Sequence, residues 1–123
     1  MITDAGRNAY GFPNEARDCT VRATAVALQM PYKDAHARLK ALGRKNRCRF
    51  TFEGKCIEAL GLESRPEFSC RRADKVLPEL AALGGRFIVR VSKHVYAVVD
   101  GTIYDNQLFE PNQKVKMVYS PKV

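Results

Sequence analysis

Residues His94–Asp105 have the sequence HVYAVVDGTIYD, in which an Asp-Gly pair separates two runs rich in β-branched and aromatic residues. Such runs are typical of strands, and Asp-Gly favours the two-residue turn of a tight hairpin. We therefore predict two antiparallel strands joined at Asp100-Gly101, with Ala97 opposite Tyr104. The register of this hairpin decides which side chains share a face of the sheet.

The predicted register brings His94 and Asp105 to the same face of the hairpin. They become diagonal neighbours whose backbones are about 7–8 Å apart, a separation that their side chains can bridge. A loop one residue longer would shift the register and put Asn106 in the place of Asp105. The two-residue turn favours Asp105 as the partner of the imidazole.

Two further segments have the composition of strands. Phe87–Val91 precedes the hairpin and Val115–Tyr119 follows it, and both are rich in β-branched and aromatic residues. Together with the hairpin, they predict an antiparallel β-meander in the C-terminal part of the chain.

The pattern is helical upstream, where Asp18–Met30 has the sequence DCTVRATAVALQM. We predict a helix from Cys19 to Met30, with the Asp18 side chain as its N-terminal cap and Pro31 as its end. Apolar residues cover most of its circumference, which indicates a central, buried helix rather than a surface one. The first turn of this helix carries the Cys19 thiol.

Three further helices are predicted between this helix and the strands. They cover Lys33–Leu42, ended by Gly43, then about Glu53–Leu60, and then Ala73–Leu83. Pro78 lies inside the last of them, so that segment is either two short helices or one kinked helix. The predicted fold class is α+β, with N-terminal helices and a buried, cysteine-bearing helix packed on the C-terminal β-meander.

Length and composition are those of one soluble domain. The chain has 123 residues, and 46 % of them are hydrophobic, enough for a single core without disulfides. We therefore expect one domain over residues 1–123. No apolar stretch follows a basic cluster near the first residue, and no apolar run approaches the roughly 20 residues that span a bilayer. These features predict a cytoplasmic protein without a membrane partner.

The cysteines lack the spacing of a structural metal site. The chain has four of them, Cys19, Cys48, Cys56 and Cys70. Without a signal peptide, reduced thiols are expected rather than a secreted disulfide scaffold. No close Cys-x-x-Cys pair occurs, and the two histidines complete no familiar ligand pattern. The sequence indicates neither a bound metal nor another cofactor.

The formal net charge is +8, and the basic residues gather in three parts of the chain. They lie in Arg44–Arg49, predicted as an exposed loop, in Arg71-Arg72 with Lys75, and in the tail at Lys114, Lys116 and Lys122. Such a surface attracts an acidic protein or nucleic acid through charge alone, and it also occurs as a set of solvated loops. No helix-turn-helix, zinc finger or aromatic platform motif accompanies these charges.

Three side chains that this fold can bring together are the parts of an activated cysteine nucleophile. The Cys19 thiol lies at a helix N-terminus, whose partial positive charge favours the thiolate. His94 supplies a base, and the Asp105 carboxylate on the paired strand orients the imidazole. Each residue also has a purely structural interpretation, as a core thiol, a strand-edge residue and a turn carboxylate.

The same residues resemble a known family. The segment DCTVRA at 18–23, GRFIV at 85–89, and HVYAVVDG with YD in the hairpin look like those of a small papain-like cysteine peptidase. They are most similar to compact bacterial and phage proteins related to the double-glycine leader peptidases of bacteriocin exporters. The resemblance spans roughly residues 18 to 106, in short motifs.

This resemblance implies roles for particular residues. It implies Cys19 as the nucleophile, His94 as the base and Asp105 as the group that orients the imidazole. The oxyanion hole of the family usually combines the backbone amide of the nucleophile with a glutamine side chain slightly upstream. The matching position here is Pro13, so the neighbouring Asn14 is left to supply the amide beside that of Cys19.

Arg22 lies one helical turn after the thiol and has two interpretations. Its guanidinium helps to bind substrate in the cleft, or it forms a buried structural ion pair with a carboxylate.

The leading functional hypothesis is a peptidase or related acyl-transfer enzyme that acts on a peptide or isopeptide bond of a peptide or protein substrate. Deamidation and transglutamination use the same chemistry with another acceptor. One alternative is a papain-like interaction module without activity, which the missing glutamine favours. The other is a basic nucleic-acid-binding domain in which the three side chains meet by coincidence.

Overall fold

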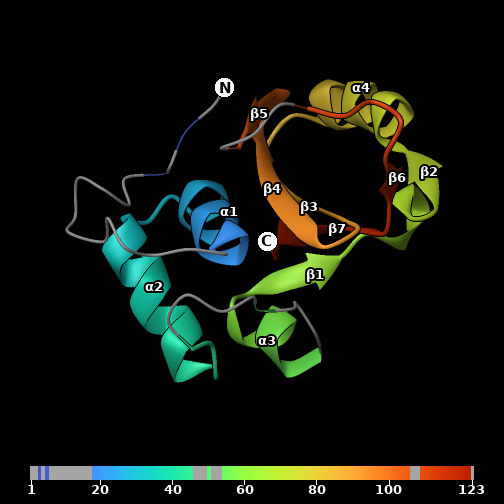
Figure 1. Ribbon diagram of the computed structural model, residues 1–123. Coiled ribbons are helices and arrows are strands. Elements are labelled where there is room, and N and C mark those ends of the chain that lie inside the picture. Colours follow the sequence, from blue (N-terminus) through green and yellow to red (C-terminus); the bar gives the residue numbers. More distant parts are fainter. Residues whose placement is uncertain are drawn as a thin grey trace.

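The computed structural model describes residues 3, 5, 18–45, 50, 54–105 and 109–122, which form helices and an antiparallel sheet (Figure 1). The helices are α1 (Cys19–Ala27), α2 (Tyr32–Ala41), α3 (Gly54–Ala59) and α4 (Ala73–Leu83), with a 3-10 turn at Pro66–Phe68. The strands are β1 (Leu62–Ser64), β2 (Arg71–Arg72), β3 (Arg86–Val91), β4 (His94–Val99), β5 (Thr102–Tyr104), β6 (Lys114–Val115) and β7 (Met117–Pro121). This architecture confirms the predicted α+β class.

The main sheet has the strand order β1-β7-β3-β4-β5, and β2 pairs with β6 in a separate ladder. Strands β3, β4 and β5 form the predicted meander. The prediction is wrong for the last strand, because β7 pairs with β3, with Ile88 opposite Tyr119. Strand β3 is mostly buried and suits the centre of a sheet, whereas the more exposed β5 suits an edge.

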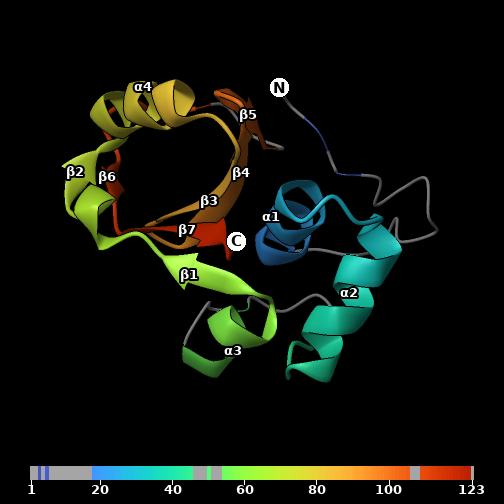
Figure 2. The same ribbon diagram turned by 180° about the vertical axis from the view of Figure 1, so that it is seen from behind.

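Helices lie on both sides of strand β4 (Figure 1 and Figure 2). Side chains alternate along this strand, so Val95 and Ala97 pack in the hydrophobic cluster that contains α1, α2 and α3. Tyr96 and Val98 pack in the second cluster, which contains α4. The sheet therefore separates two cores and holds α1 firmly against β4.

Helix α1 is buried, as predicted, but it ends earlier than Met30. Gln29 adopts a left-handed φ of 54°, and the amides of Gln29 and Met30 donate to the carbonyls of Val26 and Ala25. This pattern is a Schellman motif, which ends a helix by satisfying its last carbonyls without a proline.

The other helices follow the sequence pattern more closely. Helix α2 ends before Gly43, whose φ is 113°. Helix α4 covers the predicted segment with Pro78 inside it, so the alternative of two short helices is wrong. Helix α3 begins at Gly54, and Glu53 lies outside the described residues. In the described ranges, every helix is too short or too polar to span a lipid bilayer.

The hairpin has the predicted register, with Ala97 opposite Tyr104. Both turn residues have positive φ, 48° at Asp100 and 84° at Gly101, as a type I′ turn requires. The turn is tied to the start of β3, because the Asp100 amide donates to the Gly85 carbonyl at 2.8 Å and the Gly85 amide donates to Asp100 Oδ1 at 2.9 Å. These bonds hold in place the turn from which β5 leads to residue 105.

Fewer basic side chains are free to bind an acidic partner or nucleic acid than the net charge suggests. Arg44 is 3 % exposed, so the predicted exposed loop is wrong at this residue, and residues 46–49 lie outside the described part. Arg71 and Arg72 form ion pairs with Glu79 and Asp74. Part of the positive charge is thus neutralised within the chain.

Gly101→Ala tests whether the hairpin turn packs against α4. An added Cβ would lie 2.9 Å from the Ala81 Cβ, and a φ of 84° is unfavourable for any side chain. We expect a loss of about 2–4 kcal/mol in the free energy of unfolding, measured by urea denaturation. Gly85→Ala is the matched control, because its φ is 85° and its added Cβ meets nothing within 4 Å. It should lose only about 1–2 kcal/mol, and equal losses would contradict the contact with α4.

Candidate active site

Three elements bring the predicted thiol, imidazole and carboxylate together. Cys19 is the first residue of α1, His94 is the first residue of β4, and Asp105 directly follows β5. Because α1 packs against β4, the thiol approaches the imidazole, and the hairpin returns the carboxylate to the same place. Cys19 and His94 are half-buried, and Asp105 is buried.

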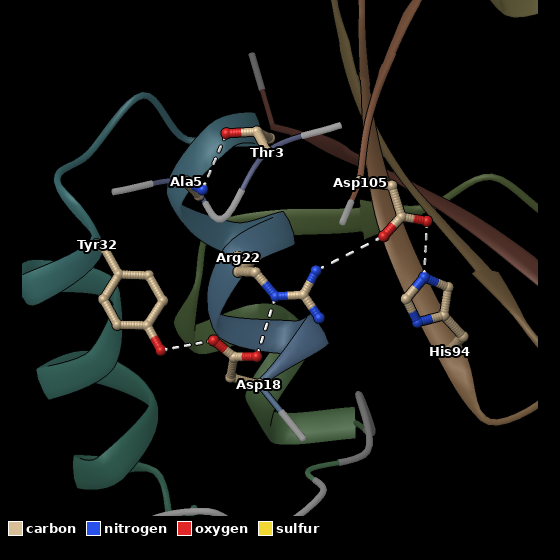
Figure 3. A network of polar contacts seen from close by, with 7 residues as sticks. All are labelled: Thr3, Ala5, Asp18, Arg22, Tyr32, His94 and Asp105. Atoms are coloured by element: carbon tan, nitrogen blue, oxygen red, sulfur yellow. Dashed lines mark hydrogen bonds and ion pairs between the residues drawn. The ribbon is translucent and has the colours of Figure 1, made fainter. Parts of the chain in front are cut away.

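The Asp105 carboxylate binds the His94 imidazole, as the hairpin register predicts (Figure 3). His94 Nε2 lies 2.8 Å from Asp105 Oδ2, and their side chains are 12 % and 7 % exposed. Asn106, the alternative partner, lies outside the described residues. A carboxylate at Nε2 fixes the tautomer and the orientation of the ring.

The second ring nitrogen of His94, Nδ1, points away from Asp105 (Figure 3). Because Nε2 is engaged, Nδ1 is the nitrogen left for the hydrogen bond between His94 and Cys19. The thiol also has a hydrogen bond with the backbone of Val95. The imidazole thus lies between a thiol and a carboxylate, the order that a nucleophile, its base and an orienting group require.

Burial and charge act in opposite directions on this pair. Burial raises the pKa of Cys19, but hydrogen bonds with His94 and Val95 and the charges of His94 and Arg22 lower that pKa on balance. Burial lowers the pKa of His94, but the hydrogen bonds and charges of Asp105 and Cys19 raise it to about 9. The two groups titrate as a coupled pair, and their opposite shifts favour a thiolate beside an imidazolium.

A buried network of Tyr32, Asp18, Arg22, Asp105 and His94 continues from the imidazole into the helices (Figure 3). Arg22 Nη1 lies 3.6 Å from Asp105 Oδ1, and Arg22 Nε lies 3.0 Å from Asp18 Oδ1. The Tyr32 hydroxyl donates to Asp18 Oδ2 at 2.7 Å. Polar contacts therefore run without a break from α2 through α1 to the imidazole.

This buried network corrects the prediction of an Asp18 cap and favours one of the two interpretations of Arg22. Asp18 lies at the N-cap position but makes no side-chain cap, because its carboxylate is bound by Arg22 and Tyr32. Arg22 is 7 % exposed and faces two carboxylates of its own chain, which is the ion-pair interpretation. A guanidinium in this position is poorly available to a substrate, so we do not propose substrate binding by Arg22.

Sequence reasoning missed two tyrosines of the site. Tyr32 contacts Asp18 across 14 residues of sequence, and nothing local indicates that contact. The Tyr96 ring centroid lies 6.1 Å from that of His94, and the Tyr96 hydroxyl is buried with no hydrogen-bond partner among the described residues. Burial and the charge of Asp105 raise the pKa of Tyr96. The available signal for Tyr96 is its place two residues after His94, on the same strand face.

The predicted oxyanion donors can be placed only in part. Asn14 lies outside the described residues. The Cys19 amide is in the first turn of α1, where helix amides have no carbonyl partner within the helix. The partial positive charge of this helix end favours negative charge that develops beside the thiol.

Comparisons with known proteins identify no relative, because no protein-family model, curated protein or solved structure matches the chain. Any function must therefore rest on the chemistry of the site itself. Across the ranges that the structure describes, no group of three or more His, Cys, Asp or Glu side chains is arranged to hold a metal ion.

The charge pair predicts one unusually reactive thiol. At about pH 6.5, iodoacetamide should modify Cys19 at least about tenfold faster than the other three cysteines, because the thiolate is the reactive form. Accessibility alone would favour Cys70, which is exposed while Cys19 is half-buried. Peptide mapping by mass spectrometry over time measures each rate.

His94→Ala is the control for this alkylation experiment. It should slow the reaction at Cys19 and leave the rate at Cys70 unchanged, because only Cys19 loses its cationic neighbour. Equal rates at Cys19 and Cys70 in the wild-type protein would contradict an activated thiol.

Proposed function

We propose that this protein is a thiol-dependent hydrolase that cleaves a peptide or isopeptide bond, with Cys19 as nucleophile, His94 as acid and base, and Asp105 as the orienting group. One observation carries the proposal. The imidazole lies between the thiol and the carboxylate, with Nε2 held 2.8 Å from Oδ2 and Cys19 on its other side. A nucleophile and a proton donor are thereby side by side.

The first half of the proposed reaction forms a thioester. The Cys19 thiolate attacks the substrate carbonyl carbon, an S–C bond forms, and the carbonyl π electrons move onto the oxygen. When the tetrahedral intermediate collapses, the C–N bond breaks and the His94 imidazolium donates its Nδ1 proton to the leaving amine. Asp105 holds the ring through Nε2 in both states.

The second half releases the acyl group. Neutral His94 accepts a proton from water at Nδ1 while the water oxygen attacks the thioester carbonyl. The C–S bond then breaks, the carboxylic acid leaves, and the thiolate–imidazolium pair is restored. With a glutamine side-chain carboxamide as substrate, ammonia leaves in the first half; water as the acceptor then gives deamidation, and an amine in place of water gives transglutamination.

Charge on the carbonyl oxygen requires donors near the nucleophile. We assign the Cys19 backbone amide as one donor, and Asn14, next to the position of the family's glutamine, as the second. Loss of one such donor typically costs about 2.7–4 kcal/mol in the transition state. The second donor is therefore as important to the proposal as the base.

The two alternatives have less support. An interaction module without activity has no need of an activated thiol, so the lowered pKa of Cys19 and the raised pKa of His94 favour an enzyme. A nucleic-acid-binding domain is not favoured, because Arg44 is buried and Arg71 and Arg72 pair with carboxylates. We propose a peptide or protein substrate as the partner, and an acidic partner stays a prediction.

A peptide probe with a thiol-reactive group tests the assignment of the nucleophile. The wild-type protein should be labelled at Cys19, and Cys19→Ser should remain unlabelled. In a mixed-sequence peptide library, Asp105→Ala should lower hydrolysis at least about 100-fold, because the imidazole loses its orienting group. Asn106→Ala, the neighbouring control, should stay within about threefold of wild type if only residue 105 reaches the ring.

Circular dichroism establishes that each variant is folded before its activity is compared. Labelling of all four cysteines at one rate would contradict the proposal, and so would hydrolysis by folded Asp105→Ala at the wild-type rate.

A further inference from the structure

We propose that Arg22 is a positioning residue, which holds the Asp105 carboxylate against His94 and adds a fixed positive charge beside the Cys19 thiolate. This inference rests on the proposed function, because it assigns a role within the same site. The guanidinium bridges two carboxylates from different parts of the chain, one at the start of α1 and one after β5 (Figure 3).

The two oxygens of Asp105 are divided between Arg22 and the imidazole. Oδ1 lies 3.6 Å from Arg22 Nη1, and Oδ2 lies 2.8 Å from His94 Nε2. A carboxylate held at both oxygens cannot rotate without losing one of these partners. Arg22 thus fixes the plane of the carboxylate and, through it, the orientation of the ring that must reach Cys19.

The charges alternate along this part of the buried network. Asp18 is negative, Arg22 positive and Asp105 negative, and the contacts continue to the His94 imidazole and to the Cys19 thiol, which complete the alternation when they form an ion pair. Arg22 follows Cys19 by three residues, so both lie on one face of α1. Its charge is one of the influences that lower the pKa of Cys19. Without Arg22, two buried carboxylates would have one cation fewer between them.

Asp18 and Tyr32 keep the guanidinium aligned. Asp18 accepts a hydrogen bond from Arg22 Nε at 3.0 Å, and its other oxygen accepts the hydroxyl of the fully buried Tyr32. Because the guanidinium is a rigid planar fork, fixing Nε aims Nη1 at Asp105. A lysine carries the same charge on a single ammonium group and cannot reproduce this geometry.

The pH response of the thiol depends on every ionisable group that faces it or the carboxylate. Among the described residues these are Asp18 before α1, Arg22 on α1, Tyr32 on α2, His94 and Tyr96 on β4, and Asp105 after β5. Arginine alone among these residue types keeps its charge over the whole working pH range. Removal of Arg22 should therefore shift the acid limb of the pH–rate profile for Cys19 alkylation to higher pH.

The test is the rate of iodoacetamide alkylation at Cys19 as a function of pH in Arg22→Gln. This readout needs no substrate. We expect the acid limb to move up by about one pH unit, so that the rate at about pH 6.5 falls about tenfold. Arg38→Gln removes an equal charge from the exposed side of α2 and should leave the profile unchanged.

Arg22→Lys is the second variant, and it carries the test if Arg22→Gln does not fold. It keeps the positive charge but loses the planar guanidinium with its several donors. The acid limb of its pH–rate profile should therefore move up by about half a pH unit. A folded variant of either kind with a wild-type acid limb would overturn the positioning role, whatever its stability. If Cys19 in the wild-type protein reacts no faster than Cys70, the proposed function fails instead, so the two failures are distinguishable.

Discussion

The Asp105 carboxylate joins the cysteine-bearing helix to the sheet, since one oxygen faces Arg22 of α1 and the other faces His94 of β4. Removing such charges from water is unfavourable, and it is tolerated only where opposite charges and hydrogen bonds surround them. In the buried network each carboxylate has a cation or a hydroxyl donor on either side. Packing of α1 on β4 aligns this network, and the network in turn fixes how α1 lies on the sheet.

The state of the thiol follows from the same arrangement. Burial alone would favour a neutral thiol and a neutral imidazole, and in an apolar site neither group would be ready for chemistry. Here the imidazole lies between two groups that carry negative charge when ionised, and this outweighs burial and raises the pKa of His94 to about 9. In the proposed reaction, the proton for the leaving amine would therefore already be on the ring when substrate binds. The position of α1 on the sheet and the raised pKa of His94 share one cause, which is the pairing of buried charges.

The parts of the site that depend on local signals are predictable from sequence, and the parts that depend on distant contacts are not. The Asp-Gly turn sets the hairpin register and places Asp105 beside the ring. Strand β7 has the composition of a strand, but nothing in its own sequence selects β3 as its neighbour. Asp18 matches the pattern of a helix cap, and only its contact with the distant Tyr32 and with Arg22 removes it from that role. Gln29 ends α1 in a conformation usually marked by glycine.

A pH titration of the His94 ring nitrogens by ¹⁵N NMR tests most directly whether the imidazole is charged between thiolate and carboxylate. In the wild-type protein both ring nitrogens should remain protonated through neutral pH, and the ring should lose one proton only near pH 9. In Cys19→Ser the same transition should move to lower pH, because the thiolate no longer stabilises the charge. A wild-type ring that titrates at its ordinary value of about 6.5, with no change in Cys19→Ser, would contradict the charge pair.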